Sequence, residues 1–243
     1  MVGIDNIAIG SGRALRKSID LRNNNLMSEF FQRNLPHYHL PNATYFITFR
    51  LTGSLPVEVW KKLKEEHEQE KRLLAGKFQG NTLHGEHYKA QKRYFARFDA
   101  LLDHPKDSPR WLTEPRFAEI VTREIHALHP EHYHLHAYCL MSNHGHLLID
   151  QQDIPEPPPL KDGKHYTALS HAMRLLKGRT GYACAALLGH KGAFWQHESY
   201  DHIVRNEKEF ERILNYIVNN PVKAGLVSYW QDWPYTFVNP DLL

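Results

Sequence analysis

The chain has 243 residues, of which 42% are hydrophobic and 23% are charged, and these values are typical of a folded globular protein with a sizeable core. Its two cysteines exclude a disulfide framework, and no run of eighteen apolar residues is present to cross a membrane. The net charge of +3 is too small to establish nucleic-acid binding by itself. We therefore expect a cytoplasmic protein whose partners must be inferred from its motifs.

The start of the chain shows little hydrophobic periodicity. Residues 1–35 are polar, and we predict a flexible N-terminal leader there, followed by a single domain over residues 36–243. Met27 is an alternative start to Met1, and the sequence does not decide between them.

The first half of the predicted domain contains one strand followed by three helices. Residues 43–53 are rich in β-branched and aromatic side chains and end at a glycine, which is typical of a strand. The first helix begins at Pro56, the second spans about 86–102, and Thr113 caps the third, which Pro130 ends. Each helix carries apolar residues at helical spacing on one face.

The second half predicts a hairpin and two further helices. The side chains of residues 133–140 and 144–150 show the pattern expected of strands, and the short break between these segments suits a hairpin. The prolines of 154–164 exclude regular structure, so we expect a surface loop before helices at about 166–188 and 207–220. The predicted strands alternate with helices along the chain, and neighbouring strands are joined by a hairpin. This pattern predicts an α+β fold with a mainly antiparallel sheet.

Two histidines flank a glycine at the start of the second hairpin strand. Residues i and i+2 of a strand point to one face, so His144 and His146 project side by side and could share one metal ion. Gly145 lies on the other face, where it leaves room for close packing. The same spacing occurs at 37–39 and 134–136, so spacing alone leaves a chance arrangement open. His-Glu-x-x-His and paired Cys-x-x-Cys are absent from the sequence, which disfavours structural zinc.

The last predicted helix places a tyrosine outside its apolar stripe. The stripe residues follow the spacing i, i+3, i+4, i+7, i+8 and are Phe210, Ile213, Leu214, Ile217 and Val218. Tyr216 lies away from this stripe, and Asn220, four residues later, shares nearly the same face. Pro221 is expected to end the helix. Taken without the histidines, these residues favour a structural interpretation, in which Tyr216 packs at the core margin and Asn220 caps the helix end.

Together these motifs resemble a known family. The segments AYCLMSNHGHLLI and FWQHESYDHIVRNEKEFERILNYIVNNPVKAGLV resemble the HUH-type single-tyrosine transposases, and among these the REP-associated tyrosine transposases. The likeness extends from residue 39 to about residue 235 and includes Trp195-Gln196 and Tyr-x-x-x-Asn-Pro-x-x-Ala-Gly-Leu in the same order. The resemblance implies a ferredoxin-like or RRM-like antiparallel sheet with helices packed on it and the histidine motif on an inner strand.

The resemblance also implies roles for individual residues. Tyr216 would be the nucleophile, His144 and His146 would hold a divalent metal ion, Mg²⁺ or Mn²⁺, and Asn220 would supply a third ligand. Gly145 departs from the family, whose members often carry a bulky apolar residue there. The implied activity is metal-dependent cleavage and strand transfer of single-stranded DNA through a 5′-phosphotyrosine, with hairpin-forming or palindromic repeats as the expected substrate. The protein would act as a monomer or homodimer in the cytoplasm, associated with the nucleoid.

Basic residues near these motifs are candidates for binding DNA phosphates without reading sequence. They are Arg174, Lys177, Arg179, Arg205 and Lys223. Ordinary solvated charge is the alternative for each of them, and Trp195 could either stack on a base or pack in the core. Two other functions stay open. One is a non-catalytic nucleic-acid-binding module on the same scaffold, and the other is a metallohydrolase with a carboxylate ligand, for which Asp150 is the nearby candidate.

Overall fold

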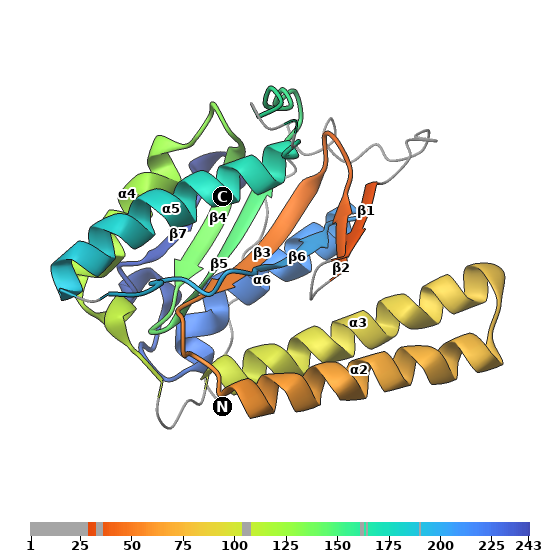
Figure 1. Ribbon diagram of the computed structural model, residues 1–243. Helices are drawn as coiled ribbons and strands as arrows, with labels where there is room; N and C mark the ends of the chain where they lie inside the picture. The colour runs from red at the N-terminus through yellow and green to blue at the C-terminus, as the bar shows by residue number, and fades with distance from the viewer. Residues whose placement is uncertain (1–28, 33–35, 104–107, 161–162, 164, 190) are drawn as a thin grey trace. The chain divides into compact units, whose positions relative to one another are not determined.

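The structure is a computed structural model that describes residues 29–32, 36–103, 108–160, 163, 165–189 and 191–243 (Figure 1). It contains two compact units. The first combines the described residues up to Leu51 with Arg110–Leu243, and the second is Thr52–Pro109. The second unit lies inside the region predicted as one domain, and the single domain over 36–243 stays a prediction.

The predicted leader lies largely outside the described residues, so it also stays a prediction. Within it, strand β1 (Glu29–Gln32) pairs antiparallel with β2 (Pro36–His39). These two strands form a small sheet of their own.

The first unit is built around a five-stranded antiparallel sheet in the order β6–β3–β5–β4–β7. Its strands are β3 (Thr44–Arg50), β4 (His134–Leu140), β5 (His144–Asp150), β6 (Tyr200–Ile203) and β7 (Thr236–Val238). Without β7, the chain runs strand, helix, strand, strand, helix, strand, and the fourth strand lies beside the first. This is the ferredoxin-like arrangement. The predicted α+β fold with the histidine motif on an inner strand is therefore confirmed.

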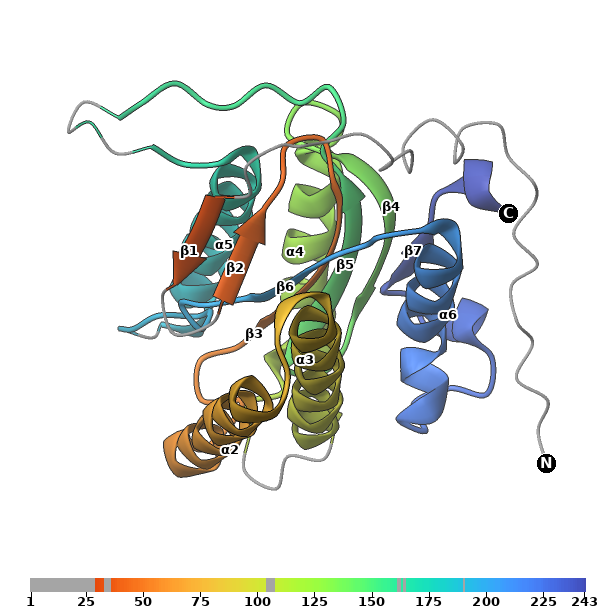
Figure 2. The same ribbon diagram turned by 90° about the vertical axis from the view of Figure 1, so that its right-hand side faces the viewer.

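Helices cover both faces of this sheet. Helices α4 (Pro115–Ala127) and α5 (Ala168–Leu188) lie on one face, whereas α6 (Glu207–Lys223) lies on the other (Figures 1 and 2). Short 3₁₀ turns complete the unit as η1 (Trp111–Thr113), η2 (Trp230–Asp232) and η3 (Pro240–Leu242). None of the helices in the described ranges is both long and apolar enough to cross a membrane.

Alternation along β3 and β5 sends two different sets of side chains to the two faces. The register pairs Phe49 with Gly145 and Thr48 with His146. The set that joins the core with α4 and α5 is Tyr45, Ile47, Phe49, Leu147 and Ile149. The opposite set faces α6, because the ring of Phe46 meets the ring of Tyr216 with their centroids 5.8 Å apart. The histidines lie on this second face.

Gly145 is required by close packing on the α4/α5 face. A Cβ at this position would lie 2.7 Å from Leu140 Cδ2 and 2.7 Å from Phe49 Cζ, distances that real Cβ atoms do not show. Phe49 is itself fixed by an edge contact with Trp195, with ring centroids 5.0 Å apart. The room that the sequence predicts beside this glycine is thus filled by Phe49 and Leu140.

The end of α6 differs from the sequence prediction. Pro221 was expected to end the helix, but α6 continues to Lys223. A proline in the last turn removes only one backbone donor, and the following residues still close the turn. Ala224 N donates to Asn220 O at 2.9 Å, and Leu226 N donates to Pro221 O at 2.9 Å.

The second unit is a helical hairpin of α2 (Val57–Lys77) and α3 (Gly80–Asp103). The helix α3 begins six residues earlier than expected, at Gly80, whose φ of +54° suits a glycine. On α2, Leu63 and His67 are buried, whereas Val57 at its start is 56% exposed.

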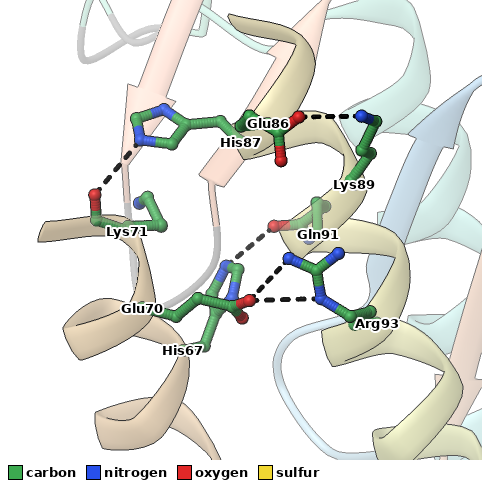
Figure 3. A network of polar contacts seen from close by, with 8 residues as sticks. All are labelled: His67, Glu70, Lys71, Glu86, His87, Lys89, Gln91 and Arg93. Carbon is green, nitrogen blue, oxygen red and sulfur yellow. Dashed lines mark hydrogen bonds and ion pairs between the residues drawn. The ribbon is translucent and has the colours of Figure 1, made fainter. Parts of the chain in front are cut away.

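Polar contacts join the two helices of the hairpin (Figure 3). His67 Nε2 donates to Gln91 Oε1 at 3.0 Å, and burial lowers the pKa of His67. Arg93 donates to Glu70 Oε1 from Nε at 3.1 Å and from a terminal nitrogen at 2.6 Å. Exposed ion pairs of this kind contribute only about 0–1 kcal/mol, so the hairpin also depends on apolar contacts between its helices.

Candidate active site

His144 and His146, called the histidine pair below, lie at the start of β5 with one ring nitrogen of each facing the other. Their Nε2 atoms are 3.2 Å apart, and their ring centroids are 4.8 Å apart. Both side chains are buried. Two nitrogens that each lie ~2.1 Å from one ion are ~3.0–3.4 Å apart, so the spacing fits a shared metal ion.

The outer nitrogen of each ring has a hydrogen-bond partner. His144 Nδ1 lies 2.7 Å from Asn143 Oδ1, and because an amide oxygen only accepts, this nitrogen carries a proton. In the neutral ring, His144 Nε2 then keeps a lone pair. His146 Nδ1 lies 2.9 Å from Thr48 Oγ1, a hydroxyl that can either donate or accept.

The environment of His146 keeps its ring neutral. Burial lowers the pKa of His146 to about 3, and the charge of Lys223 acts in the same direction. The ring of Phe46 stacks on this imidazole, with centroids 5.6 Å apart. A neutral imidazole is the form that binds a metal ion, so no proton has to be displaced near neutral pH.

Tyr216 reaches the histidine pair from α6. Its ring centroid lies 5.3 Å from that of His146, and the two rings meet at 68°. The predicted stripe of α6 is confirmed, because Phe210, Ile213, Leu214, Ile217 and Val218 are buried. Tyr216 stays partly exposed, and the phenol and the imidazoles meet within one chain. Its role as the nucleophile stays a prediction.

Asn220 lies one turn after Tyr216 on α6. Its side chain is 1% exposed, and among the residues that the structure describes neither Oδ1 nor Nδ2 has a hydrogen-bond partner. This side chain therefore does not cap the helix. An unpaired buried polar group costs about 1–3 kcal/mol, so its place in the structure calls for an explanation, of which a bound ion is one. Imidazole nitrogens and an amide oxygen are donor types that divalent cations accept, and the role of Asn220 as the third ligand stays a prediction.

Two of the predicted DNA-binding residues lie on the face opposite to the histidine pair. Arg174 and Arg179 both belong to α5. The guanidinium of Arg174 lies over the ring of Tyr166, 5.2 Å from its centroid. Arg179 is paired with Glu124 of α4 at 2.8 Å. Their contacts are thus with neighbours on the helical layer, and their DNA binding stays a prediction.

Of the other three basic residues, Lys177 also belongs to α5, whereas Arg205 precedes α6 and Lys223 lies in its last turn. Lys177 donates to His197 O at 2.7 Å and to Ser199 Oγ at 3.1 Å, and burial lowers the pKa of Lys177 to about 8. Arg205 is exposed just before α6. Lys223 is exposed in the last turn of α6, and its charge contributes to the lowered pKa of His146. Their binding of DNA also stays a prediction.

Two alternatives from the sequence are settled by packing. Trp195 is 5% exposed and donates from Nε1 to Thr180 Oγ1 at 2.8 Å, so it is a core residue rather than a platform for a base. Asp150 accepts from Thr44 Oγ1 at 2.6 Å. It also lies four residues beyond His146, ~13 Å along a strand, so it does not supply a carboxylate ligand beside the histidine pair.

Thr48 and Asn143 are site residues that sequence reasoning missed. Thr48 is separated from His146 by 98 positions, and only the pairing of β3 with β5 brings them together. Asn143 directly precedes His144, so its proximity was visible in the sequence but its hydrogen bond was not.

The fold and this site define a ferredoxin-like protein with a histidine pair on its central strand and a tyrosine facing it from a late helix. No family model matches the chain. The putative REP-associated tyrosine transposase of Haemophilus influenzae is 27% identical over 119 residues, which are 46% of this chain and 64% of that protein. The REP-associated tyrosine transposase of Escherichia coli K12 is 38% identical over 48 residues, which are 20% of this chain and 29% of that protein. These relatives confirm the resemblance to REP-associated tyrosine transposases.

The chain spans less than two thirds of the length of either curated relative that it matches. Among solved structures, a REP-associated tyrosine transposase bound to a REP hairpin is similar at 19% identity. The match covers 89% of this chain and 91% of that chain, with a TM-score of 0.46.

Proposed function

We propose that the chain is an HUH tyrosine transposase, a metal-dependent enzyme that nicks single-stranded DNA and transfers the cut strand. The observation that carries this proposal is the contact between Tyr216 and the histidine pair, with ring centroids of Tyr216 and His146 5.3 Å apart. The names of the two curated relatives support the same class. Its substrate is single-stranded DNA, with hairpin-forming repeats as the preferred form. It acts in the cytoplasm at the nucleoid, as a monomer or a homodimer.

In this proposal, His144 and His146 hold a divalent ion through Nε2, and Asn220 Oδ1 is the third protein donor. A mixed set of nitrogen and oxygen donors with open positions suits Mg²⁺ or Mn²⁺, and Mn²⁺ tolerates imidazole better. When bound, the ion polarises the phosphodiester and stabilises the charge that develops on its oxygens.

Tyr216 supplies the nucleophile. A free phenol has a pKa of about 10, so its hydroxyl must lose a proton as it attacks. The Tyr216 oxygen forms a bond to phosphorus, the bond from phosphorus to the 3′ oxygen breaks, and that oxygen leaves with a proton as a free 3′-hydroxyl. The 5′-phosphotyrosine keeps the energy of the broken bond, so the reverse attack by a 3′-hydroxyl joins strands without ATP.

A covalent adduct between protein and DNA tests this proposal. The full chain is incubated with Mn²⁺ and a hairpin-bearing single strand labelled on its 3′ side, and the products are separated on a denaturing gel. We expect the label to migrate with the protein and to be lost in Tyr216→Phe. Tyr182→Phe is the matched control, because Tyr182 is 82% exposed on α5, and it should form adduct normally.

Three outcomes contradict the proposal. If Tyr216→Phe forms as much adduct as the wild type, the nucleophile is assigned wrongly. If only a label on the 5′ side migrates with the protein, the polarity of cleavage is wrong. If DNA binds but no divalent ion produces an adduct, the chain is a non-catalytic nucleic-acid-binding module.

A further inference from the structure

The first turn of α6 contains a buried carboxylate that three different residues hold. Glu209 is 4% exposed. Its Oε2 accepts from Arg205 N at 3.1 Å. Its Oε1 accepts from His202 Nε2 at 3.2 Å and from a terminal nitrogen of Arg212 at 2.9 Å. Neither the proposed metal site nor the proposed nucleophile uses this carboxylate, so its function lies elsewhere.

These hydrogen bonds differ in what they connect. Glu209 N donates to Asn206 Oδ1 at 2.9 Å, and the Glu209 carboxylate reaches back to Arg205 N, in the manner of a capping box. These two bonds start the helix but attach it to no other element. The bond to His202 does attach it, because His202 belongs to β6 at one end of the sheet order. We call Glu209 and His202 together the clasp.

The clasp meets the sheet next to the side chain that contacts the tyrosine. The register of β6 with β3 places His202 directly opposite Phe46. Directly opposite residues of neighbouring strands share a face, so both side chains point toward α6. The Phe46 ring contacts the ring of Tyr216, with centroids 5.8 Å apart, and stacks on the ring of His146 at 5.6 Å. Adjacent side chains of the sheet thus hold both the start and the middle of α6.

The two points of attachment lie on one face of the helix. Tyr216 follows Glu209 by two turns, which is ~10 Å along the axis and within about 20° of the same direction. Rotation of α6 by one residue, ~100°, would turn Tyr216 away from the histidine pair. The apolar stripe resists this rotation, but apolar contacts have no preferred direction, whereas a hydrogen bond does. The clasp therefore adds the directional restraint.

We propose that Glu209 is a positioning residue, whose bond to His202 sets the rotation of α6 that directs Tyr216 at the histidine pair. Its effect on the reaction rests on the proposed function, whereas the placement of Tyr216 can be measured in the protein alone. Arg212 is the matched control. It holds the same carboxylate, but its side chain is 60% exposed, so water can replace its hydrogen bond.

NMR of the full chain without DNA or added metal tests the placement. In the wild type we expect a nuclear Overhauser effect between the ring protons of Tyr216 and Phe46, assigned by its loss in Phe46→Leu. Glu209→Leu and His202→Leu break the clasp and should weaken or abolish this signal. His202→Gln keeps an N–H donor and should keep the signal, as should Arg212→Ala.

Single-turnover adduct formation with saturating Mn²⁺ and hairpin-bearing single strand tests the effect on the reaction. Glu209→Leu and His202→Leu should slow this step by about 10–100-fold, because the nucleophile is misplaced, while the Kd for the strand stays unchanged. The double variant should be no slower than either single variant, because both act through one bond. His202→Gln should restore most of the rate. Circular dichroism verifies folding, and Glu209→Asp, which withdraws the carboxylate by one methylene, replaces a leucine variant that does not fold.

The outcomes separate this inference from the proposed function. If folded clasp variants keep the signal and react at the wild-type rate, the role of Glu209 is refuted and the enzyme stands. If the signal is lost but the rate is unchanged, or if His202→Gln is as slow as His202→Leu, the inference is also wrong. If the wild type forms no adduct, the proposed function fails, and loss of the signal in the clasp variants still supports the placement of Tyr216 by Glu209.

Discussion

The two faces of β5 differ in the side chains that they bury. On the face toward α4 and α5, Gly145, Leu147 and Ile149 join an apolar core in which even a methyl group at residue 145 has no space. On the face toward α6, His144 and His146 are equally buried but meet polar partners and a tyrosine. The β5 side chains on both faces are buried, yet only one face is apolar.

This difference indicates where function resides. Burying a polar group costs about 1–3 kcal/mol when it lacks a partner, and the amide of Asn220 on the α6 side has none within the described part of the chain. An apolar core of similar volume would be more stable. We therefore attribute the polar α6 face to chemistry and the α4/α5 face to stability, and substitutions on the two faces should separate these effects.

The largest expected effect is on the α6 face. His146→Ala removes one of the two proposed ligand nitrogens and should reduce adduct formation at least about 10²-fold, because the charge on the phosphate is no longer stabilised. Ile149→Val is the matched change on the other face and should cost about 0.5–1.5 kcal/mol of unfolding free energy. Gel assays and urea unfolding measure the two quantities. Equal adduct loss in both variants would contradict the division between faces.

Gly145 tests the packing of the α4/α5 face. Gly145→Ala places a Cβ 2.7 Å from atoms of Leu140 and Phe49, and we expect a loss of about 1–3 kcal/mol in the free energy of unfolding. Gly178→Ala on α5 is the control, because nothing lies within 4 Å of its added Cβ. That variant should gain about 0.5–1 kcal/mol from helix propensity. If Gly145→Ala leaves the free energy of unfolding in urea unchanged, the side chains of Phe49 and Leu140 can move to make room for the methyl group.

The pH dependence of stability tests a third imidazole on the α6 side, which is partly buried. His136 meets the ring of Phe210, with centroids 5.1 Å apart, and burial lowers the pKa of His136 to about 4. In the unfolded chain its pKa is about 6.5, so the unfolded state binds more protons as the pH falls below that value. The free energy of unfolding should therefore fall by about 2 kcal/mol as the pH is lowered from 7.5 to 5, because His136 takes up its proton more readily in the unfolded chain.

Urea unfolding of wild type and His136→Phe at both pH values measures this contribution. Phenylalanine takes no proton, so the variant should lose less stability than the wild type as the pH falls. The same loss in both proteins would mean that His136 is protonated without penalty in the folded state.

The smallest expected effect concerns DNA binding by single cations. Lys223, whose charge acts on the histidine pair, should contact a phosphate, and Lys223→Ala should reduce the slope of log affinity against log salt by about one. Arg179, paired with Glu124 on the other face, should change the slope less when replaced by alanine. An equal fall for Arg179→Ala would place DNA on the α4/α5 face as well.

Local periodicity was sufficient to predict the orientation of the main site residues. A strand repeat of two residues places His144 and His146 on one face, and a helix repeat of 3.6 places Tyr216 beside Asn220 and away from the buried stripe. The antiparallel sheet followed from the interleaved strands and helices, and the structure agrees with both.

Long-range pairing could not be predicted in the same way. Thr48 meets His146 only because β3 adds to β5 in one register, and no local pattern near residue 48 encodes that register. The contacts of Lys177 with His197 and Ser199 depend in the same way on tertiary packing. The predicted end of α6 at Pro221 was wrong, because a proline in the last turn removes only one backbone N–H donor and the helix continues to Lys223.

The central claim is that the two buried imidazoles bind one divalent ion beside Tyr216. Anomalous diffraction from crystals grown with Mn²⁺ tests it most directly. The account predicts one strong peak between His144 Nε2 and His146 Nε2, ~2.0–2.3 Å from each nitrogen, with Tyr216 on the same side of the sheet. The claim would be contradicted if the protein forms the covalent adduct with DNA but the Mn²⁺ peak in the crystals lies away from the two imidazoles.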